Sequence, residues 1–252
     1  MKYILLPALL VAVTLASSGQ QPKSTPAAFT VTPELLAAKD DTLITNDPVL
    51  PGRTYWVIVD PNKMVKQQGP MQDGKKDGTW REYGGMNHAL MKVAEYRSGK
   101  LNGVSTALNV SGMVTADETY RNDSLNGPRM LFTQSGRVRL MENYKSGQLD
   151  GTRISYYDDG KLQESGSYVM GKRDGLTKWF AQNGNVSLEY TYKLGDLNGL
   201  AKQYDEKGLI REEGNYVNNN EDGEWKVYEG GVMIKKVIYK DGNKVKEIEV
   251  RK

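Results

Sequence analysis

The sequence has no cysteine and a single histidine, His88. Without cysteine the chain can form no disulfide, no thiolate metal site, no cysteine nucleophile and no lipid-modified N-terminal cysteine. The scarcity of histidine removes the commonest general base and neutral metal ligand. No nucleophile elbow and no phosphate-binding glycine loop is present, and no serine has a histidine partner at a repeated position. We therefore expect a protein that is not an enzyme, with no cofactor and no bound metal.

Neither sign of charge dominates, because the sequence has 34 Lys and Arg residues and 31 Asp and Glu residues, for a net charge of +3. These charges are spread along the chain, so the sequence gives no reason to expect a nucleic-acid partner. Phenylalanine is also rare, with three residues, whereas tyrosine occurs 15 times and glycine 27 times. Tyrosine and glycine together favour short strands and tight turns over helices.

The apolar run at the N-terminus, from Tyr3 to Ala16, is shorter than the roughly 18–20 residues that cross a bilayer, and Pro7 interrupts it. It follows Lys2 and is followed by small residues, as in a secretion signal. We interpret residues 1–18 as a signal peptide, with a membrane anchor as the alternative, and expect a periplasmic, cell-envelope or secreted protein. Residues 19–51 contain five prolines and are predicted to be a Pro-rich linker.

An Asp-Gly or Asn-Gly step recurs seven times, and its glycines are 25 and then 24 residues apart. Another Gly, Asn or Asp usually stands four residues earlier. Since these residues best tolerate a left-handed backbone, the pattern predicts structural turns. The turn glycines are Gly78, Gly103, Gly127, Gly151, Gly175, Gly199 and Gly223. Calcium binding by the Asp and Asn side chains is the alternative, but a role in turns explains both residue types.

Each repeat carries three further columns. A tyrosine follows the turn glycine by seventeen residues, as in Tyr168, and an apolar residue such as Leu162 precedes that tyrosine by six. An even offset predicts that both lie on one face of a strand. A third column, mostly aromatic, follows the glycine by five residues, and a second glycine turn, such as Gly160, separates the two strands. Each repeat is therefore a predicted β-hairpin.

The phrases Gly171-Lys172-Arg173-Asp174-Gly175 and Asp222-Gly223-Glu224-Trp225-Lys226-Val227-Tyr228 resemble the MORN family, and more closely its bacterial variant in YwqK-like antitoxins. The resemblance covers residues 72–250. It implies successive hairpins side by side in one long, twisted antiparallel sheet. The 24-residue period and the missing second glycine of the Gly-x-Gly step distinguish this chain from the eukaryotic consensus, so a membrane-lipid partner is not expected.

These observations predict an all-β, elongated, single-layer antiparallel sheet of tandem hairpin repeats. Residues 52–71 would form an N-terminal capping hairpin, and residues 72–252 would form about seven repeats and a charged C-terminal capping strand.

The aromatic columns are interpreted first as packing residues of the sheet. Their alternative role is an exposed binding face for a protein or a glycan. The candidate binding residues are Trp80, Tyr156, Trp179, Phe180, Tyr204, Trp225 and Tyr228. The expected function is that of an exported scaffold that binds another protein, with an antitoxin-like role implied by the resemblance. A carbohydrate- or envelope-binding module is the alternative, and self-assembly through the sheet ends or the flat face of the sheet is a third hypothesis.

Overall fold

The computed structural model describes residues 41–250, which form 21 β-strands and no helix. The strands are β1 (Thr42–Asn46), β2 (Thr54–Val59), β3 (Val65–Gln72), β4 (Lys75–Lys76), β5 (Gly78–Gly84), β6 (Ala89–Arg97), β7 (Lys100–Leu108), β8 (Val114–Arg121), β9 (Ser124–Phe132), β10 (Val138–Lys145), β11 (Gln148–Leu149), β12 (Gly151–Tyr156), β13 (Leu162–Val169), β14 (Lys172–Arg173), β15 (Gly175–Phe180), β16 (Val186–Lys193), β17 (Asp196–Tyr204), β18 (Ile210–Val217), β19 (Asn220–Glu229), β20 (Val232–Lys240) and β21 (Asn243–Glu249). The predicted all-β fold is confirmed.

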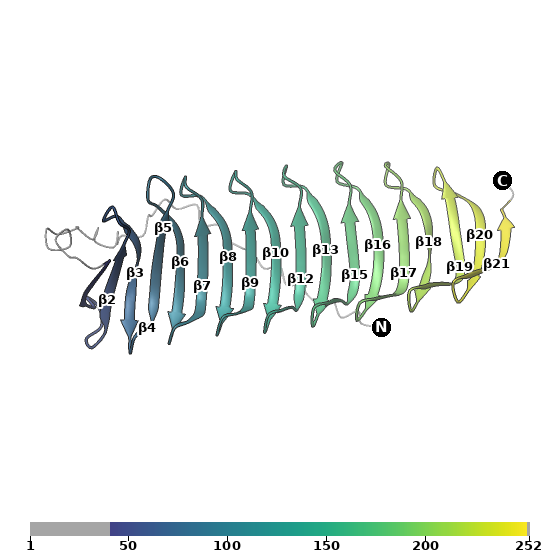
Figure 1. Cartoon of the computed structure of the whole chain (residues 1–252). Helices are drawn as coiled ribbons and strands as arrows, with labels where there is room; N and C mark the ends of the chain where they lie inside the picture. The colour runs from purple at the N-terminus through teal and green to yellow at the C-terminus, as the bar shows by residue number, and fades with distance from the viewer. Residues whose placement is uncertain (1–40, 251–252) are drawn as a thin grey trace, which may run out of the picture. The chain divides into compact units, whose positions relative to one another are not determined.

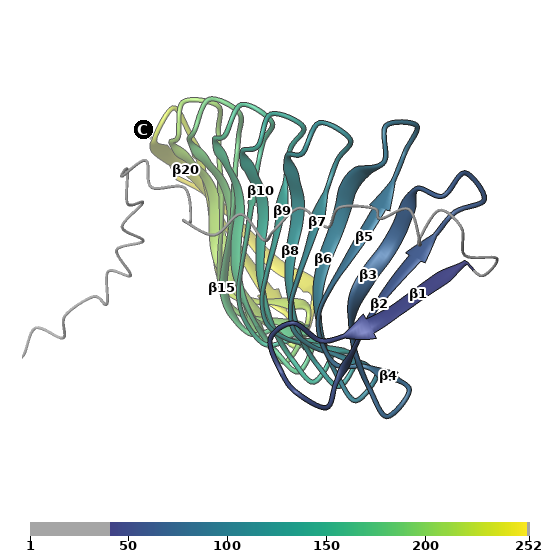
Figure 2. The ribbon, with the colours of Figure 1, turned by 90° about the vertical axis from the view of Figure 1, so that its left-hand side faces the viewer.

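All strands belong to one open antiparallel sheet, in which neighbours along the chain are neighbours in the sheet (Figure 1). The short strands β4, β11 and β14 are continuations of β5, β12 and β15, and a single aspartate separates each pair. The edges are β1 and β21, since each pairs with one strand only. Viewed along the sheet, the strands bend, so that the sheet has the form of a trough (Figure 2).

Two kinds of connection alternate along the sheet. At one margin, two-residue turns such as Ser98-Gly99 have positive φ at both positions, 49° and 84°, which is the type I′ geometry of tight hairpins. At the other margin, five-residue loops such as residues 133–137 contain a type I turn. There the Gly136 N–H donates to the Thr133 carbonyl at 3.0 Å, and Gly136 has a φ of 79°.

The seven glycines predicted to form turns lie elsewhere. Gly103, for example, lies inside β7, at a bulge where the register with β6 shifts. All seven have positive φ, from 73° to 126°, as predicted. They lie in strands, however, and not in the predicted turns. The hairpin turn is the two-residue step that includes the position four residues earlier, because two successive residues with positive φ are needed there. These glycines are Gly78, Gly103, Gly127, Gly151, Gly175, Gly199 and Gly223.

The Asp or Asn before most of these glycines ties one repeat to the next. The Asp174 carboxylate accepts a hydrogen bond from the Leu194 N–H at 2.9 Å, at the start of the following turn. The hydrogen bonds run in the opposite direction where the two-residue turn of the next repeat lacks glycine, as at Asn218-Asn219. Asn219 Oδ1 accepts from the Leu197 N–H at 2.7 Å, and Asn198 Nδ2 donates to Asn218 Oδ1 at 3.4 Å. Backbone capping thus accounts for the repeated oxygen-bearing side chains.

A second bulge, next to each five-residue loop, changes the face of the residues beyond it. Tyr156 pairs with Leu162 and Ser155 pairs with Glu164, so Gln163 is an extra residue in β13. Leu162 therefore faces away from Glu164 and Tyr168, and the prediction that the apolar and tyrosine columns share a face was wrong. We call the face that carries Tyr168 the aromatic face, and the other the opposite face.

The structure covers the predicted domains only in part. The proposed signal peptide and residues 19–40 of the proposed linker lie outside the described residues. Within residues 41–51 the linker prediction fails, because β1 pairs with β2 along its whole length, from Thr42 opposite Ile58 to Asn46 opposite Thr54. The hairpin expected at residues 52–71 is formed by β2 and β3. Between residues 41 and 250, no helix is long and apolar enough to cross a membrane.

Candidate interaction surface

Two tryptophans of the predicted binding face are internal. Trp80 and Trp225 are each 1% exposed, and each indole lies over a glycine of the preceding strand. A Cβ on Gly214 would come within 2.1 Å of the Trp225 ring, and a Cβ on Gly69 within 2.5 Å of Trp80. Their indole N–H groups donate to the Asn215 carbonyl at 3.1 Å and the Pro70 carbonyl at 2.8 Å. These two residues stabilise the sheet and are not available to a ligand.

The C-terminal half of the aromatic face is a row of rings in edge-to-face contact. Successive ring centroids from Trp179 through Tyr190, Tyr216 and Trp225 to Tyr239 are 5.8, 6.2, 5.1 and 6.2 Å apart. Such pairs stabilise by about 0.5–1.5 kcal/mol each beyond the burial of their area. The row crosses β15 to β20 and holds neighbouring hairpins together.

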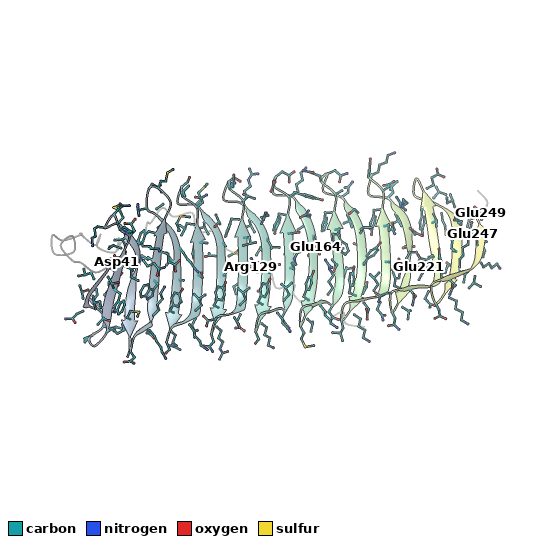
Figure 3. All side chains as sticks on the ribbon, viewed as in Figure 1. Asp41, Arg129, Glu164, Glu221, Glu247 and Glu249 are labelled. Carbon is teal, nitrogen blue, oxygen red and sulfur yellow. The ribbon has the colours of Figure 1, made fainter. Side chains whose placement is uncertain are left out.

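The middle of the aromatic face carries a ladder of alternating charge across β8 to β14. The Arg129 guanidinium donates to Glu118 at 2.8 Å and to Glu142 at 3.0 Å, and Arg153 donates to Glu142 at 3.2 Å and to Glu164. Figure 3 labels Arg129 and Glu164 within this part of the sheet. The ladder ends at Arg173, which binds Glu164 at 2.7 Å and stacks over Tyr168, Trp179 and Tyr192.

The carboxylates of the ladder are buried or half-buried, and arginines surround them. Glu142 and Glu164 are 6% and 8% exposed. At Glu118, burial tends to raise the pKa, but hydrogen bonds from Arg129 and from the Tyr120 hydroxyl outweigh it and hold the pKa below its ordinary value. Every carboxylate of the ladder has at least one arginine partner, so the ladder is a structural network.

The other four predicted binding residues, Tyr156, Phe180, Tyr204 and Tyr228, belong to the opposite face. The Tyr204 hydroxyl donates to Glu189 at 3.1 Å and the Tyr228 hydroxyl to Glu213 at 2.7 Å. The predicted single binding face is therefore two faces, with the three tryptophans on one and these four residues on the other. Strand alternation causes the division, because Trp179 and Phe180 are adjacent in β15 and Trp225 precedes Tyr228 by three residues in β19.

These four residues are part of a continuous row, which we call the apolar band, that crosses the opposite face from β5 to β20. Each member is half-buried, and each pairs with another member across the strands. The members are Tyr83, Leu90, Leu108, Val114, Phe132, Val138, Tyr156, Leu162, Phe180, Val186, Tyr204, Ile210, Tyr228 and Met233.

The apolar band widens over β9 to β12, where Met130 pairs with Met141 and Ile154 also pairs with Met141. In later repeats, charged residues occupy the positions that correspond to Met141 and Ile154. Lys178, for example, binds Glu189 at 2.6 Å. Met141 is 36% exposed, so apolar surface faces solvent at this point. Sequence columns alone did not show this widening, because Met130 and Met141 belong to no regular column.

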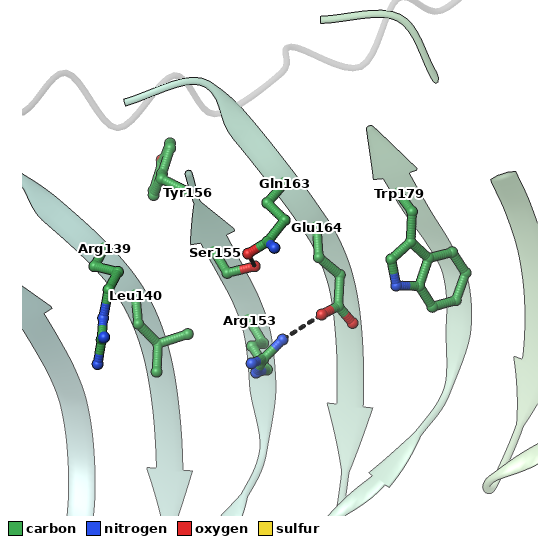
Figure 4. Close-up of a pocket in the computed structure, with 8 residues that line it drawn as sticks. All are labelled: Arg139, Leu140, Arg153, Ser155, Tyr156, Gln163, Glu164 and Trp179. Carbon is green, nitrogen blue, oxygen red and sulfur yellow. Dashed lines mark hydrogen bonds and ion pairs between the residues drawn. The ribbon is translucent and has the colours of Figure 1, made fainter. Parts of the chain in front are cut away.

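A hollow opens on the aromatic face between β10 and β15 (Figure 4). Its lining combines aromatic, charged and amide side chains: Arg139, Leu140, Arg153, Ser155, Tyr156, Gln163, Glu164 and Trp179. Among the described residues no group of acidic or histidine side chains could hold a metal ion. His88 lies in the loop after β5, with its Nε2 3.6 Å from Asp60.

Raising the pH from 10 to 12 should progressively destabilise the sheet. Burial, followed by nearby carboxylates, raises the pKa of Tyr120, Tyr204, Tyr216 and Tyr228 from 10.0 to about 12. Below pH 10 these tyrosines are neutral in both states, so their stabilising effect is complete. As the pH rises through the folded pKa, that effect is lost, because the unfolded chain releases its protons first.

Urea unfolding at a series of pH values, with tyrosinate absorbance recorded in parallel, measures this effect. Between pH 10 and 12, Tyr204→Phe should lose less stability than the wild-type protein does, with each protein compared with its own stability at neutral pH. Tyrosine ionisation complete near pH 10 with an unchanged urea midpoint would contradict the prediction.

Comparison with known proteins agrees with this architecture. The family model described as MORN repeat variant matches residues 149–170, 173–194 and 197–218. These segments run through β11 to β18 and follow one another at the repeat period. No curated protein matches the chain. Three consecutive hairpins of this sheet are thus similar to MORN repeat variants.

Proposed function

We propose that the protein is an exported, non-catalytic scaffold that binds another protein along the apolar band of its opposite face. MORN repeats are generally interaction modules and typically lack catalysis, which supports this class of function. The observation that carries the proposal is the uninterrupted apolar band itself. Apolar side chains that gather in one row at a surface mark interaction sites, whereas scattered ones do not.

The chemistry of the widened part favours a protein partner. Methionine is flexible and polarisable and is enriched in the core of protein interfaces. Met130, Met141 and Ile154 form an apolar centre, and towards the C-terminus the same row carries the ion pair of Lys178 and Glu189. A polar margin around an apolar centre is the usual arrangement of such an interface.

Export rests on Lys2 and the apolar run of residues 3–16, which precede the described part of the chain. The resemblance to YwqK-like antitoxins adds a narrower form of the proposal, in which the partner is an exported toxin that the scaffold neutralises.

Affinity purification from envelope and culture-medium fractions, with the chain from Gln20 onwards as bait, tests the proposal. We expect one protein to be recovered in stoichiometric amount. Met141→Lys should reduce its recovery about tenfold or more, because a charge would be buried in the interface. Leu194→Lys is the matched control, since Leu194 is 48% exposed in a two-residue turn away from the apolar band. Equal recovery with Met141→Lys would overturn the assignment of the binding face.

A further inference from the structure

The hollow on the aromatic face is built by two bulges. Arg139 is the extra residue between Val138 and Leu140 of β10, and Gln163 is the extra residue of β13, one repeat later. Bulges re-aim side chains out of the regular alternation of a strand. As a result Arg139 and Gln163 both line the hollow, together with Arg153, Glu164 and Trp179 (Figure 4).

Three side chains of the hollow, Arg139, Gln163 and Trp179, have hydrogen-bond donors without a partner among residues 41–250. Both Glu164 oxygens are occupied, by Arg153 and Arg173, and Gln163 Oε1 accepts from the Ser155 hydroxyl at 3.2 Å. In contrast, Arg139 is exposed and makes no hydrogen bond or ion pair with another group of residues 41–250. Within the same residues, Gln163 Nε2 and the indole N–H of the half-buried Trp179 donate to nothing, whereas the buried indoles of Trp80 and Trp225 do donate.

The charge balance of the hollow points the same way. Arg153 and Glu164 neutralise each other, as the dashed contact in Figure 4 shows, whereas the charge of Arg139 is uncompensated. A ligand that fits must therefore supply acceptors and a negative charge. A carboxylate would match the planar guanidinium of Arg139 with two parallel hydrogen bonds.

The walls indicate what else the ligand contains. Trp179 presents aromatic surface, while Gln163 and Ser155 are neutral polar groups. Arg139 on β10 and Trp179 on β15 lie on either side of the Arg153–Glu164 pair, three strand spacings apart, or about 14 Å. An oligosaccharide fits such a lining, because each sugar ring has an apolar face and hydroxyl groups around its edge.

We propose that this hollow binds a carboxylate-bearing oligosaccharide, with the acid group on Arg139, hydroxyls on Gln163 and the Trp179 N–H, and a sugar ring against Trp179. The site is on the other face from the apolar band, so ligand binding in the hollow does not depend on the protein partner proposed above. An acidic peptide is the alternative ligand, but a peptide would make less use of the aromatic walls.

Calorimetric titration of the full chain with a trimer of galacturonic acid tests the site. We expect binding of the acid trimer and much weaker binding of the neutral galactose trimer. Arg139→Gln should weaken the acid trimer about tenfold or more, the factor for a lost hydrogen bond to a charged group. Arg211→Gln is the matched control, because Arg211 occupies the same bulge position three repeats later and does not line the hollow.

Trp179→Phe keeps an aromatic ring but removes the indole N–H, and it should also weaken binding. Met141→Lys should leave it unchanged. No binding of the acid trimer, equal binding of the neutral trimer, or the same loss with Arg211→Gln would each overturn the proposal. Binding of a glutamate tripeptide as tightly as the acid trimer would show that the ligand class is wrong.

Discussion

Replacing Trp225 with alanine should lower the free energy of unfolding by about 3–5 kcal/mol, the usual cost of truncating a buried aromatic side chain. Trp225 is 1% exposed, donates its indole N–H to Asn215, and touches Tyr216 and Tyr239 edge-to-face. In a single-layer sheet no second layer can move in to fill the space. Urea unfolding followed by circular dichroism measures the loss, and a change below about 1 kcal/mol would contradict a structural role.

Gly214 offers a partner for a double-mutant cycle with Trp225. Gly214→Ala should destabilise the wild-type sheet by about 1–3 kcal/mol through overpacking, because its Cβ would meet the Trp225 ring. In the Trp225→Ala background the same change should cost little, since the obstructing ring is gone. Gly214 has no positive φ, so backbone strain does not contribute. Equal effects in both backgrounds would show that the glycine is there for another reason.

The repeat architecture could be predicted because hairpins leave regular marks in a sequence. The alternation of two glycine positions fixed the period, and the apolar columns fixed two strands for each repeat. Placing the turn at Gly175 instead of Met170-Gly171 was an error of assignment, because both positions need positive φ. A two-residue hairpin loop needs two such residues in succession, and that requirement distinguishes the two positions.

The assignment of side chains to faces failed for a different reason. Counting by two along a strand assumes a regular ladder, but every repeat contains an extra residue, such as Gln163, next to its five-residue loop. One inserted residue moves everything beyond it to the other face. The bulges separate Leu162 from Glu164 and Tyr168, and they aim Arg139 and Gln163 into the hollow. A bulge depends on cross-strand pairing, which sequence columns do not contain.

The charge ladder has a visible signal in the sequence, which is the regular spacing of its arginines and glutamates. Arg129 and Arg153 are one period apart, as are Glu118 and Glu142, and each arginine follows a glutamate by eleven residues. In a hairpin repeat this offset places opposite charges on neighbouring strands. The Glu118–Arg129 and Glu142–Arg153 contacts follow directly.

Replacing Arg153 with methionine should destabilise the protein by about 1.5–3 kcal/mol, the range for losing a hydrogen bond to a charged group. Arg153 lies between Glu142 and Glu164, and its removal leaves each of these buried carboxylates with one arginine, Arg129 or Arg173. Methionine retains most of the length of the side chain, so the loss reports charge and not volume. Urea unfolding at neutral pH is the measurement.

Lys202→Met on the opposite face is the control, because its pair with Glu213 is longer, at 3.6 Å, and more exposed. It should cost less than about 1 kcal/mol. Adding Glu142→Gln to Arg153→Met should restore part of the stability, since it removes one of the two carboxylates left short of a partner. If Arg153→Met and Lys202→Met have the same effect, the ladder is only a set of surface pairs.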